Sequence, residues 1–259
     1  SYTLTLLLQG SHQKLLEKAR LIDNKRSDIY HLVGRTAYEQ GQYDSAIRNL
    51  TQAIKLDGQN TGHRYWLARA HMSRNENKSA GKEFDRIIRE VSSETQLNDL
   101  ECESYFLRAK MLRDEGLSSW ARALRLLDSH LKCAPKHGEA HLVRGRIHAD
   151  YRSLEKARKD FDRAADLAVA DKKIRVAAEA FFEAAQVLKR ERRFDQNELI
   201  ALFQKSVKSD PKFAPPHRDL CTLFAQDQPR VAKTHCKSYL EAAPKGLYAT
   251  EVREVLRNL

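Results

Sequence analysis

Glycine and proline are scarce in this sequence: its 259 residues include 10 Gly and 6 Pro. All-β proteins need these residues in many tight turns, so their scarcity argues against a protein built of short strands. No stretch approaches the roughly 20 consecutive apolar residues of a membrane-spanning helix. What is abundant is Ala, Leu, Glu, Lys and Arg, the residues that favour helices most strongly. The composition therefore predicts an all-α protein.

Cysteine is also sparse, and the four cysteines lie far apart, at Cys102, Cys133, Cys221 and Cys236. No close pair has the spacing of a zinc knuckle or of a redox motif. In a chain of this length they do not suggest a disulfide framework, so we expect small buried thiols. Free thiols mildly favour a reducing compartment.

The first residue is Ser rather than Met, and four leucines follow within the first eight residues. Two interpretations of residues 1–26 stay open: an N-terminal capping helix, or the remnant of a removed leader. A cytoplasmic location is slightly favoured. A periplasmic or lipid-anchored protein is the expectation if a leader was removed.

Internal repetition is the strongest feature of the sequence. A small residue recurs at intervals of 34, 43, 34, 42 and 33 residues, with one leucine in the series: Ala46, Ala80, Ala123, Ala157, Leu199 and Ala232. A large residue follows four positions after each: Leu50, Phe84, Leu127, Phe161, Phe203 and Cys236. A regular period of this kind predicts stacked helix pairs, because one pair cannot bury its apolar face alone.

Residues 27–60 show the pattern most clearly. They combine a small Gly34 in a first helix, a Gly-Gln-Tyr-Asp turn that begins at Gly41, and Ala46 and Ala53 in a second helix. This pattern resembles the tetratricopeptide repeat, and the resemblance covers roughly residues 27–246. It implies a right-handed α-solenoid of about six helix-turn-helix units, near 27–60, 61–94, 101–137, 138–171, 172–213 and 214–246. Insertions near 92–100 and within 191–197 account for the two long intervals.

A C-terminal capping helix is expected at residues 247–259. Its apolar residues recur with helical spacing, at Leu247, Val252, Val255, Leu256 and Leu259. Such a stripe is suited to covering the open face of the last unit.

The resemblance also implies a binding surface, because in this family the first helices line a concave face that commonly binds extended peptides or partner helices. In four successive first helices, a cation directly follows the small residue of the repeat. In chain order these cations are Arg35, Arg69, Lys110 and Arg146. Four residues before these cations stand His31, Tyr65, Phe106 and Leu142, and Phe182 continues the row in the fifth unit. The i, i+4 spacing places each such pair on one helix face. Cations interleaved with rings suit an acidic, partly apolar segment.

Catalytic motifs are missing: there is no Gly-rich phosphate loop, nucleophile elbow or metalloprotease helix. His137 and His141, with His148 further on, resemble half of a metal site. However, His141 and His148 fall where the repeat expects packing residues, so we interpret them as structural. His235 beside Cys236 suggests a thiol–imidazole pair, but Cys236 occupies a packing position as well. We expect no enzyme activity, no metal and no cofactor.

The charge is basic, with 46 Lys and Arg against 35 Asp and Glu, for a formal net charge of +11. The densest cluster is the run Lys189–Arg193. Basic clusters attract nucleic acid and anionic lipid, but no nucleic-acid motif accompanies this one. Nucleic acid is therefore not the expected partner, and a membrane is expected only through a partner or an N-terminal anchor.

The sequence thus predicts a non-catalytic scaffold or adaptor within a multiprotein assembly. It would bind an acidic peptide or partner helix in a basic-aromatic groove through His31, Arg35, Tyr65, Arg69, Phe106, Lys110, Arg146 and Phe182. Pairing of these cations with carboxylates of the protein, such as Asp28, Glu39, Glu139 and Asp150, stays open. Also open are a regulatory or recruiting subunit of an enzyme complex, a basic scaffold touching nucleic acid or membrane, and homo-oligomers formed through the solenoid ends.

Overall fold

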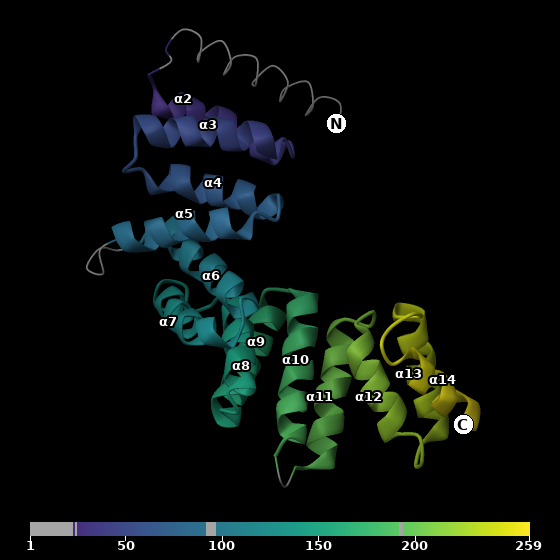
Figure 1. The fold of residues 1–259 in the computed structure, drawn as a ribbon. Coiled ribbons are helices and arrows are strands. Elements are labelled where there is room, and N and C mark those ends of the chain that lie inside the picture. Colours follow the sequence, from purple (N-terminus) through teal and green to yellow (C-terminus); the bar gives the residue numbers. More distant parts are fainter. Residues whose placement is uncertain (1–22, 24, 92–96, 192–193) are drawn as a thin grey trace. The chain divides into compact units, whose positions relative to one another are not determined.

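The computed structural model describes residues 23, 25–91, 97–191 and 194–259, and Figure 1 shows their arrangement. This part of the chain contains thirteen α-helices and no strand, which confirms the all-α prediction. Nearly all of segment 1–26, and parts of both expected insertions, lie outside the described residues.

The helices pack as successive antiparallel pairs, as expected for tetratricopeptide-type repeats. In order along the chain they are α2 (Ser27–Glu39), α3 (Tyr43–Leu56), α4 (Thr61–Ser73), α5 (Asn77–Glu90), α6 (Asp99–Asp114), α7 (Leu117–Cys133), α8 (Gly138–Asp150), α9 (Leu154–Ala170), α10 (Ile174–Lys189), α11 (Gln196–Ser209), α12 (Ala214–Leu223), α13 (Pro229–Ala242) and α14 (Ala249–Asn258). The chain divides into two compact units, Ser1–Cys133 (unit 1) and Ala134–Leu259 (unit 2), each of which includes three helix pairs.

Local signals in the sequence set several helix boundaries. Asn98 caps α6: its side chain accepts hydrogen bonds from the backbone of Leu100 and Glu101, and Glu101 accepts one from the Asn98 backbone. This reciprocal arrangement satisfies amide groups that a helix start leaves unpaired. Gly41, in the turn between α2 and α3, has a φ of 75°, a left-handed conformation that glycine adopts at little cost.

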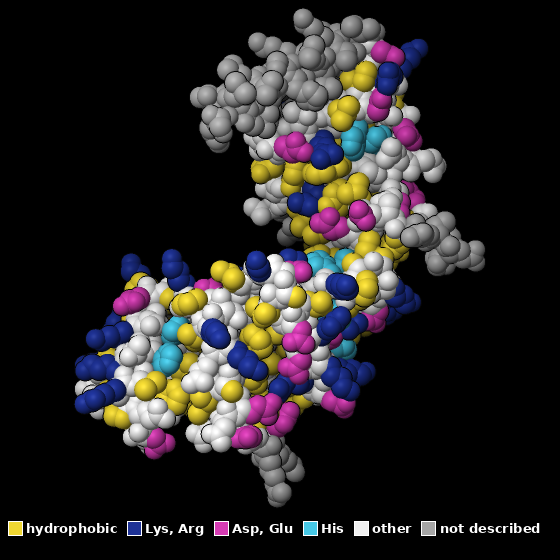
Figure 2. All heavy atoms as spheres, turned by 180° about the vertical axis from the view of Figure 1, so that it is seen from behind, with side chains coloured by type: hydrophobic (Ala, Val, Ile, Leu, Met, Phe, Trp, Pro, Cys, Tyr) yellow, Lys and Arg dark blue, Asp and Glu magenta, His cyan; other side chains and the backbone are white. Residues whose placement is uncertain are grey.

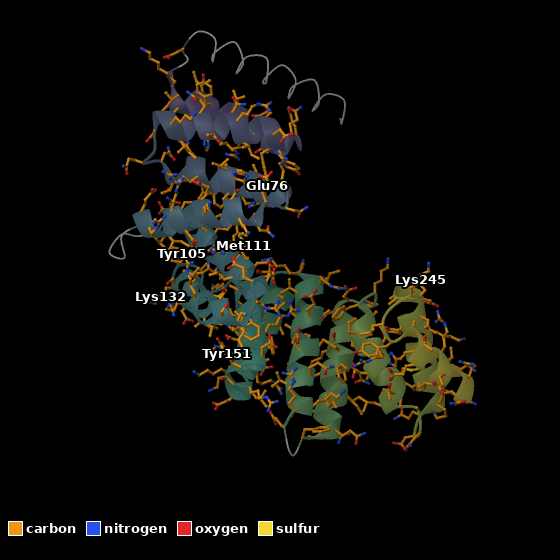
Figure 3. All side chains as sticks on the ribbon, viewed as in Figure 1. Glu76, Tyr105, Met111, Lys132, Tyr151 and Lys245 are labelled. Carbon is orange, nitrogen blue, oxygen red and sulfur yellow. A yellow bond between two sulfur atoms is a disulfide. The ribbon has the colours of Figure 1, made fainter. Side chains whose placement is uncertain are left out.

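Close approach of paired helices explains the small residues of the repeat. A Cβ atom added to Gly34 would lie 2.7 Å from Cγ of Leu50, and one added to Gly145 would lie 2.6 Å from Cε1 of Phe161. Leu50 and Phe161 are fully buried. Side chains occupy the space between paired helices (Figure 3), and a larger residue at either glycine would push its pair apart.

The turns between helices are also held by side chains. Glu76 lies between α4 and α5, where Figure 3 labels it, and its carboxylate is 2.6 Å from Nδ1 of His71 and 3.2 Å from Nε of Arg74. The carboxylate of Glu76 thus stabilises the turn between α4 and α5.

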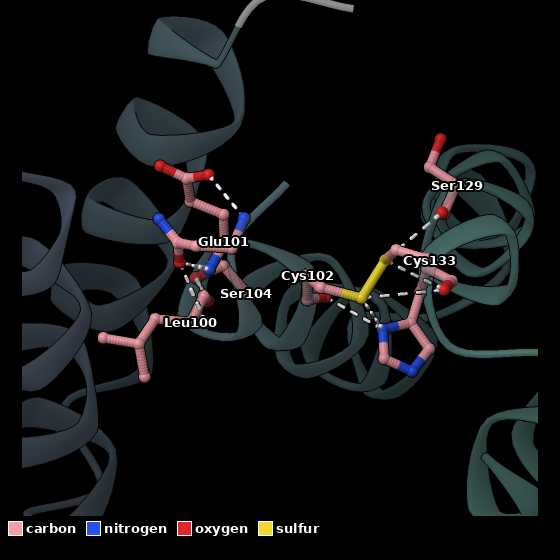
Figure 4. The surroundings of a disulfide bond; sticks show 8 residues. Leu100, Glu101, Cys102, Ser104, Ser129 and Cys133 are labelled. Atoms are coloured by element: carbon pink, nitrogen blue, oxygen red, sulfur yellow. Dashed lines mark hydrogen bonds between the residues drawn. A yellow bond between two sulfur atoms is a disulfide. The ribbon is translucent and has the colours of Figure 1, made fainter. Parts of the chain in front are cut away.

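The cysteines form two disulfides, which corrects the expectation of buried free thiols. Cys102–Cys133 joins α6 to α7 in unit 1 with a Cα–Cα distance of 6.3 Å (Figure 4), and Cys221–Cys236 joins α12 to α13 in unit 2 at 5.0 Å. The expectation was wrong because spacing along the chain was considered, whereas antiparallel pairing brings distant residues together. The inference of a reducing compartment loses its basis.

The second disulfide replaces a packing contact. In the repeat register, Cys221 stands at the small position occupied by Gly34 and Gly145, and Cys236 stands at the large position of Leu50 and Phe161. Both sulfur-bearing residues are fully buried. A covalent bond therefore joins α12 and α13 where a small residue and a large one meet in other pairs.

Helix α14 covers the last pair, within the segment expected to form the C-terminal cap. Ala249 and Val252 are buried in a cluster with Cys221, Cys236 and Tyr239. Leu247 does not join them, because it is 88% exposed and precedes the helix. The boundaries proposed for the six units and the cap stay a prediction.

Candidate functional site

Unit 1 places three of the predicted cations on neighbouring first helices. Arg35 lies on α2, Arg69 on α4 and Lys110 on α6, and α4 contacts both α2 and α6. The guanidinium carbon of Arg35 lies 4.9 Å from the ring centre of Trp66. Nε of Arg35 also donates to Glu39 over 3.0 Å, with both side chains about half exposed. Arg35 is thus a solvent-facing cation stacked on an indole.

Arg69 is held by the rings and by a carboxylate of the next first helix. Its Nη1 donates to the Tyr65 hydroxyl over 2.8 Å and lies 3.3 Å from Oε1 of Glu103, and its Nη2 lies 3.4 Å from the Tyr38 hydroxyl. Tyr65 in turn donates to Oε2 of Glu103 over 2.7 Å. Burial, followed by this hydrogen bond, raises the pKa of Tyr65, so the hydroxyl stays protonated as a donor.

The aromatic side chains that face this surface differ from those expected. Tyr65 and Phe106 are 2% and 4% exposed, so both rings pack inside unit 1. The half-buried rings beside the cations are those of Tyr38 and Trp66, whose centres lie 5.4 Å apart in an edge-to-face contact. Nζ of Lys110 lies 5.3 Å from the centre of the Phe106 ring.

The contacts of Arg35 and Arg69 link α2, α4 and α6, and Lys110 lies beside Phe106 on α6. We refer to the residues that make these contacts as the unit 1 strip: Arg35, Tyr38, Tyr65, Trp66, Arg69, Glu103, Phe106 and Lys110. Tyr38 and Trp66 were not among the residues predicted. Their positions are three residues from Arg35 and Arg69, a spacing that places side chains on one helix face and could have revealed them.

His31 packs against a second imidazole at the start of the strip. Its Nδ1 lies 2.9 Å from Nδ1 of His63, which is buried on α4. Burial, followed by the neighbouring His63, lowers the pKa of His31 to about 4, and burial lowers the pKa of His63 as well. Both rings are therefore neutral at pH 7, with one Nδ1–H donating to the other nitrogen. His31 contributes polar packing rather than charge.

Unit 2 holds the fourth predicted cation in a different environment. Arg146 on α8 donates from Nε to Glu183 over 2.8 Å and from Nη2 to Glu179 over 2.9 Å, and both acids lie on α10. Phe182, also on α10, packs against the rings of Phe203 and Phe213 with ring centres 5.9 and 5.6 Å away. Internal pairing, the alternative left open above, therefore holds for Arg146.

The carboxylates that pair with the cations are mostly not those expected. Glu39 does pair with Arg35, whereas Asp28 pairs with Arg26 outside the strip. The unexpected partners, Glu103, Glu179 and Glu183, lie 33 to 37 residues after the arginines that they bind, one repeat later. The repeat period itself was the signal that could have found them.

The histidines near residue 141 belong to a buried ion-paired network. Asp160 is 5% exposed and accepts from Nε and Nη2 of Arg144 over 2.9 and 2.7 Å, with Nδ1 of His141 at 3.2 Å. Burial alone would raise the pKa of Asp160, but His141 and Arg144 hold it below its usual value. His141 also contacts the Pro135 carbonyl over 3.2 Å, so it serves structure, as the repeat register predicted.

Among the described residues, one group brings three potential metal ligands together: Cys102, His130 and Cys133. The two cysteines form a disulfide, so they do not offer thiolates (Figure 4). Nδ1 of His130 lies 2.8 Å from the Cys102 carbonyl oxygen. This nitrogen donates a hydrogen bond there, so its lone pair is not available to a metal ion. The residues as arranged do not fit a metal ion.

The basic run is partly engaged within the protein. Lys189 lies 3.0 Å from Oδ1 of the buried Asp219, and Arg190 donates to the Ala149 carbonyl over 3.2 Å. On the face shown in Figure 2, basic and acidic side chains are interspersed among hydrophobic ones. None of the helices in the described residues has both the length and the apolar composition that a bilayer crossing requires.

Two segments of the chain, residues 37–100 and 113–172, match family profiles that are both described as tetratricopeptide repeat. The chain is a tetratricopeptide-repeat protein. A comparison with curated proteins found no match.

Solved structures show the same fold at low sequence identity. YrrB, described as a tetratricopeptide-repeat protein with an unusual peptide-binding site, is 15% identical with a TM-score of 0.64, over 79% of this chain and 96% of that one. PilF of Pseudomonas aeruginosa is 15% identical with a TM-score of 0.67, over 88% and 96%. A chain of the APC/C hetero-tetramer Cut9–Hcn1 is 14% identical with a TM-score of 0.64, over 95% of this chain and 46% of that one.

As a tetratricopeptide-repeat protein, the chain is in general terms a scaffold for protein–protein interaction. Proteins of this family are generally non-catalytic and bind protein partners. Absence of enzyme activity in this chain stays a prediction, as does partner binding by the residues named from the sequence.

Proposed function

We propose that the unit 1 strip binds an acidic segment of a protein partner, and that the chain acts as an adaptor in a multiprotein assembly. The observation that supports this most directly is the stacking of cations on rings at the same repeat position. Arg35 lies over Trp66, Arg69 lies beside Tyr38 and Tyr65, and Lys110 lies over Phe106.

Stacking suits these cations for carboxylate recognition. A guanidinium that lies flat on a ring keeps its N–H edge directed away from the ring, where a carboxylate can accept two hydrogen bonds. Arg35 already pairs with Glu39, but both side chains are about half exposed. Exposed i, i+4 pairs contribute about 0.5 kcal/mol or less, so a ligand carboxylate can replace Glu39 at little cost.

The rings add apolar contact beside the charges. Tyr38 and Trp66 are half-buried, so each presents part of its ring to solvent next to Arg35 or Arg69. A segment that alternates acidic and apolar side chains is complementary to such a surface. His31 and Phe182 were predicted to take part, and we assign His31 to packing within unit 1 and Phe182 to packing within unit 2.

Arg146 is not placed in the proposed binding surface. Two carboxylates already bind it, and a ligand acid would have to displace Glu179 or Glu183. A regulatory or recruiting subunit of an enzyme complex would use the unit 1 strip in the same way. The described peptide-binding site of YrrB and the hetero-tetramer of Cut9 with Hcn1 are consistent with such roles.

Affinity capture from an extract of cells that express the protein tests the proposal. The full chain is compared with an Arg35→Glu, Lys110→Glu variant. The matched control is Arg48→Glu with Lys55→Glu, which changes the charge equally at two exposed positions of α3 in the same unit. We expect loss of a defined partner from the strip variant and its retention by the control, with both variants folded by circular dichroism. Equal capture by all three proteins would contradict the proposal.

A further inference from the structure

A separate concave surface lies in unit 2, where α10 packs against both α9 and α11. It is a hollow of about 460 Å³ lined by residues of these three helices and of the turn between α9 and α10. The lining that matters here consists of Val169, Ile174 and Phe181 together with Lys172, Lys205 and Lys208. We refer to it as the lysine-rimmed hollow. Its volume is in the range of sites that bind ligand groups.

The interior of the hollow is apolar. Ala168 and Ala177, which are 1% exposed, line it together with the half-buried Phe181. Val169 and Ile174 remain 55% and 60% exposed. Single exposed apolar residues are common, but several around one hollow mark a place that an apolar group can fill.

The rim is positively charged, and no carboxylate lines it. Lys205 and Lys208 lie three residues apart on α11, a spacing that directs both side chains to one face, and Lys172 lines the same hollow from the α9–α10 turn. Lys205 also lies 5.7 Å from the centre of the Phe181 ring. No ion pair of these three lysines occurs among the described residues, whereas the adjacent Lys173 and Arg175 pair with Asp171 and Asp210.

We infer that the lysine-rimmed hollow docks a short acidic segment of a protein, with one or two apolar side chains in the hollow and flanking carboxylates on Lys172, Lys205 and Lys208. A concave apolar site receives side chains from a partner, whereas insertion into a bilayer requires apolar side chains that protrude. Three cations around an apolar hollow also lack the extended basic track that a nucleic-acid backbone needs. This surface shares no residue with the unit 1 strip, so either site can fail alone.

Binding of synthetic peptides to the full chain tests the inference. The probe is a fluorescein-labelled Glu-Glu-Glu-Leu-Phe-Glu-Glu-Glu peptide, followed by fluorescence anisotropy at low ionic strength. One control peptide replaces every Glu by Gln, and the other replaces Leu-Phe by Ser-Ser. Since the site needs both charge and apolar contact, we expect the probe to bind about tenfold more tightly than either control peptide.

Variants of the chain locate the binding. The Lys205→Glu, Lys208→Glu variant is expected to bind the probe at least about tenfold more weakly than the unchanged chain. Lys233→Glu with Lys237→Glu, at exposed positions of α13 in the same unit, changes the net charge equally and is expected to change affinity less than about twofold. Val169→Ser with Ile174→Ser is expected to weaken binding similarly to the first pair, and both residues are exposed enough for the fold to tolerate the change.

Four results would overturn the inference. The first is a probe affinity no higher than that of the control peptides, and the second is equal weakening of probe binding by both lysine pairs, which would indicate general charge attraction. Weakening by Arg35→Glu with Lys110→Glu alone would place the peptide on the unit 1 strip and so support the proposed function instead. Sedimentation with vesicles of phosphatidylcholine and phosphatidylglycerol that depends on Lys205 and Lys208, without peptide binding, would identify a lipid surface.

Discussion

The two units carry different chemistry at the same repeat position. In unit 1 this position is a cation on each of three first helices, and Arg35, Arg69 and Lys110 all lie over aromatic rings. In unit 2 it is Arg146, bound by two carboxylates, and then the neutral Gln186 and Thr222. Equivalent register therefore does not produce equivalent surfaces. Whether a cation can meet a partner depends on what the next repeat places beside it.

Unit 2 also carries cations away from its first-helix position. In unit 2 the lysines around the hollow between α9, α10 and α11 have no ion pair among the described residues, while the first-helix cation Arg146 is neutralised. The recognition surfaces we propose are consequently the first helices in unit 1 and the lysine-rimmed hollow in unit 2. The following predictions test this contrast.

The largest effect on stability is expected from removal of the disulfides, of which each unit contains one. They close loops with sequence separations of 31 and 15 residues, for which loop entropy predicts about 3 to 4 kcal/mol of stability each. Replacing either pair by serine should lower the free energy of unfolding by this amount, measured by urea denaturation. A Cys221→Ala, Cys236→Leu variant should be more stable than Cys221→Ser, Cys236→Ser, because it restores the small and large residues of the other pairs.

Accessibility should separate the two disulfides. Cys133 is exposed, whereas Cys221 and Cys236 are fully buried, so a thiolate reaches the unit 1 disulfide first. Under native conditions a dithiol reductant should expose Cys102 and Cys133 to alkylation before Cys221 and Cys236, as followed by mass spectrometry. Equal rates would remove this distinction between the units, and four reactive thiols in the denatured, unreduced chain would show that neither bond forms.

The next effect concerns the arginines themselves. Arg146→Gln should cost about 2 kcal/mol of stability, because Glu183 loses its cation and Glu179 keeps only Arg175, at positions about one-quarter exposed. Arg35→Gln should cost less than about 1 kcal/mol, since its ion pair is exposed and only the contact with Trp66 is lost. Urea midpoints of the two variants measure the difference. Similar costs would contradict the different roles assigned to the two arginines.

Much of the fold followed from the repeat period, since Gly34 and Gly145 mark the close contacts of helix pairs. The same register contained the second disulfide: it assigned Cys221 to a small position and Cys236 to a large one, and such positions face each other within a pair. The acids that bind Arg146 lie one period further along. What the register did not indicate is how deeply each ring is buried: Tyr65 and Phe106 pack inside unit 1, whereas Trp66 is half-buried beside Arg35.

A smaller effect is expected from pH, through one histidine pair in each unit. His217 and His235 in unit 2 lie 3.0 Å apart through their Nδ1 atoms, as His31 and His63 do at 2.9 Å in unit 1. Burial, followed by the neighbouring imidazole, lowers the pKa of His31 and of His235 to about 4.

Stability should therefore fall as the pH is lowered. The pKa values in the folded protein lie below the ordinary value of 6.5, so between this value and about pH 4 the unfolded chain binds more protons. The contribution of the neutral pairs is complete above the ordinary pKa and is lost progressively through this window. Urea midpoints at several pH values should show a shallower decline for His31→Gln and for His235→Gln than for the unchanged chain. If the decline of the urea midpoint with pH is the same in one variant as in the unchanged chain, the histidine pair of that unit does not contribute to the pH dependence of stability.

The smallest effect on stability is expected at Lys172, on the rim of the unit 2 hollow. Its φ of 55° is a left-handed conformation, which asparagine adopts more readily than lysine. Lys172→Asn should therefore leave the free energy of unfolding within about 0.5 kcal/mol of the unchanged chain, or raise it slightly. The acidic probe peptide should nevertheless bind about threefold more weakly, because one of three rim cations is gone. Since this substitution favours the backbone of the turn, a loss of affinity cannot be attributed to a damaged fold. Unchanged affinity would restrict the charge contacts to Lys205 and Lys208 on α11.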